Sequence, residues 1–148
     1  MILNKKKISI IALLLVIIII IVAKAFIFKN GTLKSIYNID DFTIDHAALS
    51  DFNSSTVKDI SDPIILQDLI DYVLSLDLVP VFIDSHEKST EDLSLRLYDN
   101  TNNKHIFIDI CNDSEITISY SEYKTKPVNT YKVKEKLDIT YIKKMFDI

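Results

Sequence analysis

The chain has 148 residues, a net charge of -4 and one cysteine. No acidic residue occurs before Asp40, so the 119 residues from Asn30 onward carry 12 basic and 21 acidic groups, a net charge of -9. Because nucleic acid requires a basic footprint, this acidic body argues against a nucleic-acid partner. One cysteine also excludes an intramolecular disulfide framework, and the length fits a single domain behind the N-terminal segment.

An almost unbroken apolar run begins the chain. Lys5–Lys7 precede it, and Ile8–Phe28 spans 21 positions in which Ser9 and Lys24 are the only markedly polar residues. At 1.5 Å per residue a helix of this length reaches about 31 Å, the hydrocarbon thickness of a bilayer. The pattern predicts a transmembrane anchor over residues 8–28, in contact with the lipid bilayer, behind a basic cytoplasmic N-terminus of residues 1–7.

The leading lysines also predict an orientation. The positive-inside rule places the N-terminus in the cytoplasm and the C-terminal domain outside it, so the expected location is the cell membrane with a single pass. Ala23-Lys24-Ala25 is a pattern after which signal peptidase cuts, and cleavage after Ala25 would instead release a secreted domain. The apolar stretch Ile8–Ala23 is longer than the about 7–15 residues of an ordinary signal peptide, which favours the anchor.

The segment after the apolar run is polar. Residues 29–41 are predicted to form a stalk or linker, and residues 42–148 the extracytoplasmic domain. Two strands are expected next, Phe42–Leu49 and Thr56–Ile60, paired as a hairpin. Asp62 followed by Pro63 is typical of a helix start, because the aspartate can cap free N–H groups and proline fits the first helical position.

The helix that starts at this point is amphipathic, and four alternating segments follow it. Its apolar residues form one stripe over about four turns, namely Ile65, Leu66, Leu69, Ile70, Val73 and Leu76. The segments LSLRLY, HIFIDIC, ITISY and NTYKVK then alternate with a period of two, which predicts a four-stranded antiparallel meander. Asp138 can cap a short C-terminal helix.

These elements predict an α+β fold. An N-terminal transmembrane helix would precede a two-layer domain, in which a hairpin and a meander form an antiparallel sheet covered by the two amphipathic helices. The order of TVKDISDPIILQDLIDYV, LSLRLYDN, HIFIDI, EITISY, TYKV and YIKKMF resembles small bacterial extracytoplasmic domains of unknown function, membrane-anchored or of lipoprotein type. That resemblance implies no activity and no site residues.

One group of residues has the composition of a nucleophilic site. His105, Asp109 and Cys111 share one face of a predicted strand, and a thiol, an imidazole and a carboxylate are its usual parts. Six residues of strand separate His105 from Cys111 by about 20 Å, whereas a catalytic dyad needs hydrogen-bond contact. We therefore expect a structural thiol and no catalytic residue.

A second group could bind a metal. Asp84, His86 and Glu87 lie on a charged loop and are weak candidate ligands for a divalent cation. Their spacing matches no calcium loop, and no glycine is present to make the sharp turn. We expect a solvated loop and no cofactor, with a metal-assisted enzyme using residues 84–92 as the alternative.

A third group suggests a partner surface. Phe107, Tyr98 and Tyr131 are predicted to form an exposed aromatic patch on the outer face of the sheet, where a partner could bind. The sequence thus predicts a membrane-anchored interaction or binding module without catalytic activity. Its partner would be a protein or a cell-wall polymer.

Overall fold

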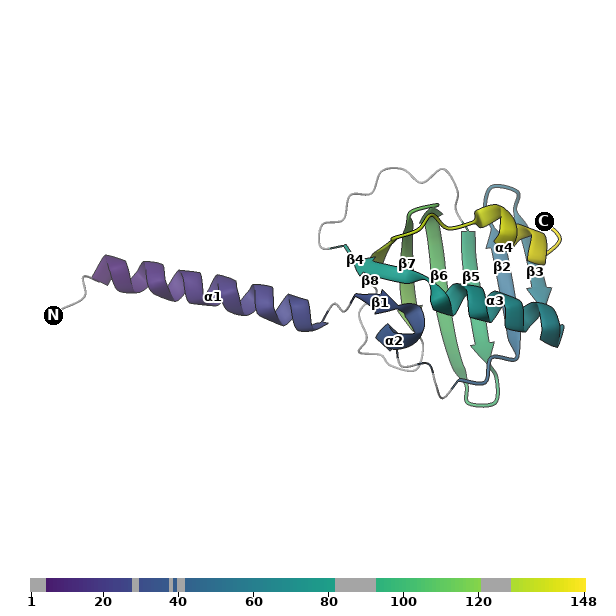
Figure 1. The fold of residues 1–148 in the computed structure, drawn as a ribbon, viewed down its shortest axis with the longest axis horizontal. Helices are drawn as coiled ribbons and strands as arrows, with labels where there is room; N and C mark the ends of the chain where they lie inside the picture. Colours follow the sequence, from purple (N-terminus) through teal and green to yellow (C-terminus); the bar gives the residue numbers. More distant parts are fainter. Residues whose placement is uncertain (1–4, 28–29, 38, 40–41, 82–92, 121–128) are drawn as a thin grey trace.

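The computed structural model describes residues 5–27, 30–37, 39, 42–81, 93–120 and 129–148, and it describes side chains in helix α1 (Lys5–Ile27) for residues 10–22. Helix α1 extends away from the sheet that forms the rest of the molecule (Figure 1). Its described side chains are all exposed.

The predicted transmembrane anchor is not supported. Within the described part of the chain, no helix combines the length and the apolar character needed to cross a membrane. The predictions of a single-pass topology and of a cell-membrane location with an extracytoplasmic domain are therefore wrong.

One antiparallel sheet of eight strands forms the body of the molecule, in the order β1-β4-β8-β7-β6-β5-β2-β3. The strands are β1 (Gly31–Thr32), β2 (His46–Asp51), β3 (Thr56–Ile60), β4 (Asp77–Pro80), β5 (Leu93–Asp99), β6 (Lys104–Asn112), β7 (Glu115–Tyr120) and β8 (Asn129–Val133). The helices are α2 (Leu33–Tyr37), α3 (Pro63–Ser75) and α4 (Ile139–Met145). Figure 1 shows α3 crossing the sheet, with α4 on the same face.

The expected fold class was wrong in its anchor and in the extent of its sheet, which has eight strands instead of the six of a hairpin and a meander. The hairpin β2–β3 joins the meander β5–β8 through β2 and β5, with Ala47 opposite Leu97. Strands β1 and β4 extend the other end through β4–β8. Pro80 pairs with Tyr131 of β8 and lies beyond the two residues of β4 that pair with β1. Because Pro80 has no neighbour in β1, its missing N–H removes no hydrogen bond between β4 and β1.

Part of the predicted stalk belongs to the core. Leu33 is fully buried, and the ring of Tyr37 lies 6.4 Å from the ring of Tyr131. The one glycine of the chain, Gly31, begins this segment with a φ of +148°, a backbone conformation that residues other than glycine rarely adopt. The turn after it is held by Ser35, whose Oγ donates to the carbonyl oxygen of Thr32 at 2.9 Å.

The predicted inward rows of the meander are confirmed. Alternate residues of β5, β6, β7 and β8 are buried, and they form one core with residues of α3 and α4. These are Leu93, Leu95, Leu97, Ile106, Ile108, Ile110, Ile116, Ile118, Tyr120, Tyr131 and Val133 from the strands, with Leu66, Leu69, Val73 and Ile142 from the helices. Period-two patterning therefore located the buried face correctly.

Both predicted helix caps are also confirmed. Asp62 accepts hydrogen bonds through Oδ1 from the backbone N–H of Ile64 at 2.9 Å and of Ile65 at 3.1 Å. Asp138 Oδ1 accepts from the N–H of Tyr141 at 2.9 Å. Each carboxylate satisfies donors that have no partner within the helix.

Candidate functional site

The sheet has two faces with different cover. The face described above carries α3 and α4, and we call the opposite one the outer face. No helix of the described chain lies on the outer face (Figure 1). Side chains that alternate with the buried rows of β2, β5, β6 and β7 point to it.

Five partly exposed residues from three adjacent strands gather on this outer face. They are His46 of β2, Arg96 and Tyr98 of β5, and His105 and Phe107 of β6, and we call them the outer-face patch. The register explains the grouping, since Tyr98 lies opposite both His46 and His105, and Arg96 lies opposite Phe107. Directly opposed residues in antiparallel strands are close enough for their side chains to touch.

The rings of the outer-face patch form a continuous series of contacts. The centroids of His46 and Tyr98 are 5.4 Å apart, those of Tyr98 and His105 5.0 Å, and those of His105 and Phe107 6.3 Å. The Arg96 Cζ atom lies 5.7 Å from the Phe107 ring centroid, within the range of a cation–π interaction. Edge-to-face ring pairs contribute about 0.5–1.5 kcal/mol each, so the contacts hold the side chains in place.

Arg96 differs from the ion-paired lysines of the described chain. Lys134 pairs with Asp77, and Lys143 Nζ lies 3.1 Å from Asp51 Oδ2. Arg96 is the one arginine in the sequence, and its buried Nε has no hydrogen-bond partner among the described residues. A buried donor without a partner is unusual and calls for an explanation.

Small residues and paired acids surround the arginine. Ala48 lies opposite Arg96 on β2 and is buried, as is Ser94, two residues before Arg96 on the same face. The Oγ of Ser94 donates to Asp109 Oδ1 at 2.7 Å, and His46 Nε2 lies 3.4 Å from Asp59 Oδ1. Asp109 and Asp59 are thus engaged with neighbours other than Arg96.

The predicted aromatic patch needs one correction. Tyr98 and Phe107 lie together in the outer-face patch, but Tyr131 is 1% exposed and points into the core on the other face. Its hydroxyl lies 3.5 Å from that of Tyr37, and burial raises the pKa of Tyr37, with the contact to Tyr131 adding to the effect. The sequence carried the signal, because Tyr131 has the same strand phase as the apolar Val133.

Sequence reasoning also missed part of the patch. It considered His105 only as a partner of Cys111, and it assigned no surface role to Arg96 or His46. The signal was present for Arg96, which alternates with the buried leucines of LSLRLY and therefore shares a face with Tyr98. The pairing of β2 with β5, which brings His46 to Tyr98, has no signal in local periodicity.

The nucleophilic group is not assembled. His105, Asp109 and Cys111 do share the outer face of β6, but His105 pairs with Tyr98 near one end of the strand. Cys111 lies near the other end, where the register shifts between Ile110 and Asn112. A strand keeps such residues about 20 Å apart, too far for proton transfer between them.

The candidate metal ligands Asp84, His86 and Glu87 lie outside the described residues. In the part of the chain that the structure does describe, no three or more His, Cys, Asp or Glu residues are grouped so as to hold a metal ion. The structure therefore leaves the predicted loop site as a prediction.

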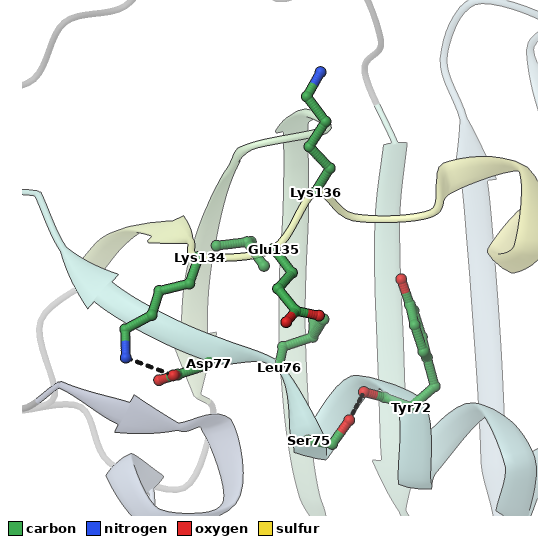
Figure 2. Close-up of a pocket in the computed structure, with 8 residues that line it drawn as sticks. Tyr72, Ser75, Leu76, Asp77, Lys134, Glu135 and Lys136 are labelled. Carbon is green, nitrogen blue, oxygen red and sulfur yellow. Dashed lines mark hydrogen bonds and ion pairs between the residues drawn. The ribbon is translucent and has the colours of Figure 1, made fainter.

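A cavity of about 290 Å³ lies on the helical side, between the end of α3, β4 and the segment after β8. It is lined by Tyr72, Ser75, Leu76, Asp77, Val133, Lys134, Glu135 and Lys136, and Figure 2 shows seven of these labelled. Its polar groups largely bind protein atoms. Ser75 Oγ donates to the Tyr72 carbonyl oxygen at 2.8 Å, and Lys134 pairs with Asp77 (Figure 2).

Two further contacts show that the cavity wall is structural. Lys136 points away from the cavity in Figure 2 and pairs with Asp113 at 2.6 Å. The Tyr72 hydroxyl accepts from the backbone N–H of Asp138 at 2.8 Å, which connects α3 to the start of α4. Burial raises the pKa of Tyr72, and the Asp138 charge adds to it. The residues that line the cavity thus connect α3, β4 and the segment after β8. The outer-face patch is the stronger candidate site.

Comparisons of the chain with family models, with curated proteins and with solved structures find no match. The resemblance to small bacterial extracytoplasmic domains therefore stays a prediction, and the candidate function rests on the outer-face patch.

Proposed function

We propose that the chain is a binding module without catalytic activity and that it binds a protein partner through the outer-face patch. The observation that carries this proposal is the cluster of two histidines, a tyrosine, a phenylalanine and an arginine, partly exposed on a sheet face without a helical cover among the described residues. The opposite face already packs against α3 and α4.

The composition of the patch supports a protein partner. Tyr, Phe and Arg are enriched in protein interfaces, and Tyr and Arg are among the residues that most often dominate binding energy. The ring contacts from His46 to Phe107 also restrict these side chains before binding. Since binding must overcome the entropy of ordering side chains, a pre-ordered patch loses less affinity to that cost.

The pairing of polar groups on this face supports a non-catalytic role. Ser94 donates to Asp109, and His46 lies against Asp59. A nucleophilic site needs a nucleophile, a base in hydrogen-bond contact and a third group that orients the base. Cys111 and His105, at opposite ends of β6, do not supply that arrangement.

The test is photo-crosslinking followed by affinity measurement on the full chain. A photoreactive amino acid at position 107 is compared with one at position 64, where Ile64 is 75% exposed on α3 outside the patch. The protein captured from the producing cells is identified and purified. Its Kd is then measured for the unmodified chain and for Phe107→Ala, Tyr98→Ala and Ile64→Ala.

We expect capture at position 107 and not at position 64. Truncation of Phe107 or Tyr98 should weaken Kd by about 10- to 30-fold, the effect of losing a well-packed aromatic anchor. Ile64→Ala should leave Kd within about twofold of its original value. If both aromatic truncations leave the Kd unchanged, in variants whose unfolding midpoints are also unchanged, this face is not the binding surface.

A further inference from the structure

Arg96 is a strong donor group whose hydrogen bonds are incomplete. Its guanidinium carries five N–H donors and stays charged at any ordinary pH. The Nε–H is buried and has no partner among the described residues. Leaving a buried donor unsatisfied is costly, so the Nε–H gains free energy when the guanidinium turns to meet an acceptor.

The side chain is placed where a partner would meet it. Arg96 lies in the middle of the outer-face patch, with Phe107 opposite it on β6 and the small Ala48 opposite it on β2. The guanidinium rests over the Phe107 ring at 5.7 Å. Arginine is suited to such a position because its planar group can lie over a ring and still offer N–H donors at its edge.

We propose that Arg96 binds a carboxylate on an acidic segment of the partner protein, an inference that rests on the proposed function. Nε and one terminal nitrogen form a fork that matches the two oxygens of a carboxylate. To present Nε, the guanidinium turns outward from the Phe107 ring, so binding exchanges a cation–π contact for a charged double hydrogen bond. The partner segment lies across Tyr98 and Phe107 with apolar side chains next to its acid.

The local charges favour a carboxylate over a phosphate. Arg96 is the chain's one guanidinium, and the exposed carboxylates of Asp59 and Asp109 belong to the same face. A phosphate carries up to two negative charges and meets more repulsion from these aspartates than a carboxylate with one. The rings of the patch also give no advantage to a bare anion, whereas they can contact apolar side chains of a peptide.

The single arginine allows a direct test by NMR. In the isotope-labelled full chain, only Arg96 contributes an arginine Nε–H resonance, so its shift reports on this group without further assignment. The probes are a capped peptide of alternating glutamate and leucine, its counterpart with glutamine in place of glutamate, and inorganic phosphate. Each is titrated at the same ionic strength, because exposed charges are screened by salt.

The expected result is a saturable shift with the glutamate peptide and none with the glutamine peptide or phosphate. Arg96→Lys keeps the charge but loses the fork, and it should bind the glutamate peptide about tenfold more weakly. Lys132→Gln is the matched control, since it removes one positive charge from the exposed surface of β8. Its affinity should stay within about twofold of the unmodified chain.

Three outcomes would overturn the inference. Equal shifts of the Arg96 Nε–H resonance with the glutamine and glutamate peptides would show that the carboxylate is not recognised. A larger shift with phosphate would show that Arg96 binds a different anion. No shift with any probe would show that Arg96 does not bind a ligand. If Phe107→Ala weakens the Kd of the captured partner while the glutamate peptide does not shift the Nε–H resonance, the binding surface is supported and the proposed carboxylate contact is wrong. If neither Phe107→Ala nor Tyr98→Ala changes the Kd of the partner, the proposed function itself is wrong.

Discussion

Asp51 at the end of β2 and Lys143 in α4 form an ion pair, with Lys143 Nζ 3.1 Å from Asp51 Oδ2. Asp51 is 4% exposed, and its Oδ1 also accepts from the backbone N–H groups of Asn53 at 3.0 Å and Ser54 at 3.3 Å. The pair connects the C-terminal helix to the hairpin β2–β3. One carboxylate therefore stabilises both a turn and a contact between layers.

The pH dependence of this pair gives the first prediction. Burial raises the pKa of Asp51, but the hydrogen bonds from Lys143, Ser54 and Asn53 outweigh it and hold the pKa below its usual value of 3.8. A carboxyl with a lowered folded-state pKa stabilises the fold above its unfolded pKa, and that stabilisation is lost as the pH falls through the folded pKa. Asp51→Asn should therefore lower the free energy of unfolding by about 1–3 kcal/mol at neutral pH.

Denaturant melts at about pH 7 and at about pH 2 measure this effect. The gap between the unmodified chain and Asp51→Asn should narrow at the acidic pH, where the carboxyl of the unmodified chain is protonated as well. Lys143→Ala removes the other half of the ion pair and should also lower the free energy of unfolding at neutral pH. Lys144→Ala is its control, since Lys144 is exposed. A gap that stays constant across this range would assign the cost to packing rather than to charge.

The second prediction compares two neighbours on β6. Ile108 is 2% exposed and belongs to the core with Leu69 and Val73 of α3, whereas Phe107 is partly exposed on the outer face. Ile108→Ala leaves a cavity and should cost about 2–5 kcal/mol of unfolding free energy. Phe107→Ala should cost less. Paired denaturant melts on the full chain decide it, and a larger loss for Phe107→Ala would reverse our assignment of the two faces.

The third prediction concerns Gly31. Its φ of +148° is strained for any residue with a Cβ, and a Cβ placed there would lie 2.6 Å from Ser35 Oγ. Gly31→Ala should destabilise the fold by about 1–3 kcal/mol. The double variant with Ser35→Ala removes the clash but not the backbone strain, so its melting curve should recover only part of the loss. Full recovery would mean that the side-chain clash alone matters.

The fourth prediction concerns the lone thiol. Cys111 lies at the irregular end of β6, away from His105 near the other end of the strand. Cys111→Ser should leave the unfolding midpoint nearly unchanged, within the about 0.5 kcal/mol typical of substitutions outside the core. It should also leave partner affinity unchanged. A folded Cys111→Ser variant with no partner binding would give the thiol a role that its position does not predict.

Periodicity predicted the parts of the fold that bury long regular rows. The alternating leucines and isoleucines of β5 and β6 identify the core face because strand side chains alternate strictly. The two-residue strand β1 and the four-residue strand β4 are too short to display a period. Pairing between distant strands also has no local signature, so the joining of β2 to β5, and with it the position of His46, could not be predicted.

The same limit applies to the candidate site. Phe107 and Tyr98 could be placed on the outer face by counting along their strands, and the same count should have placed Arg96 there. Tyr131 was misassigned because a tyrosine reads as a surface aromatic, although it has the phase of a core residue. The missing hydrogen-bond partner of Arg96 Nε depends on three-dimensional packing, which no pattern in the sequence reports.

The junction between β2 and β5 has a consequence for the order of folding. The pairs within β5–β8 join neighbouring segments, but β2 and β5 are separated in sequence by β3, α3 and β4. Contacts between distant segments form late because closing the longer loop costs more entropy. The hairpin β2–β3 should therefore dock after the meander β5–β8 has formed and open before it does, and amide hydrogen exchange should be faster at Leu49 than at Ile108. Since His46 is on one side of this junction and Tyr98 on the other, each opening would divide the outer-face patch, so a bound partner should slow exchange in β2 more than in β7.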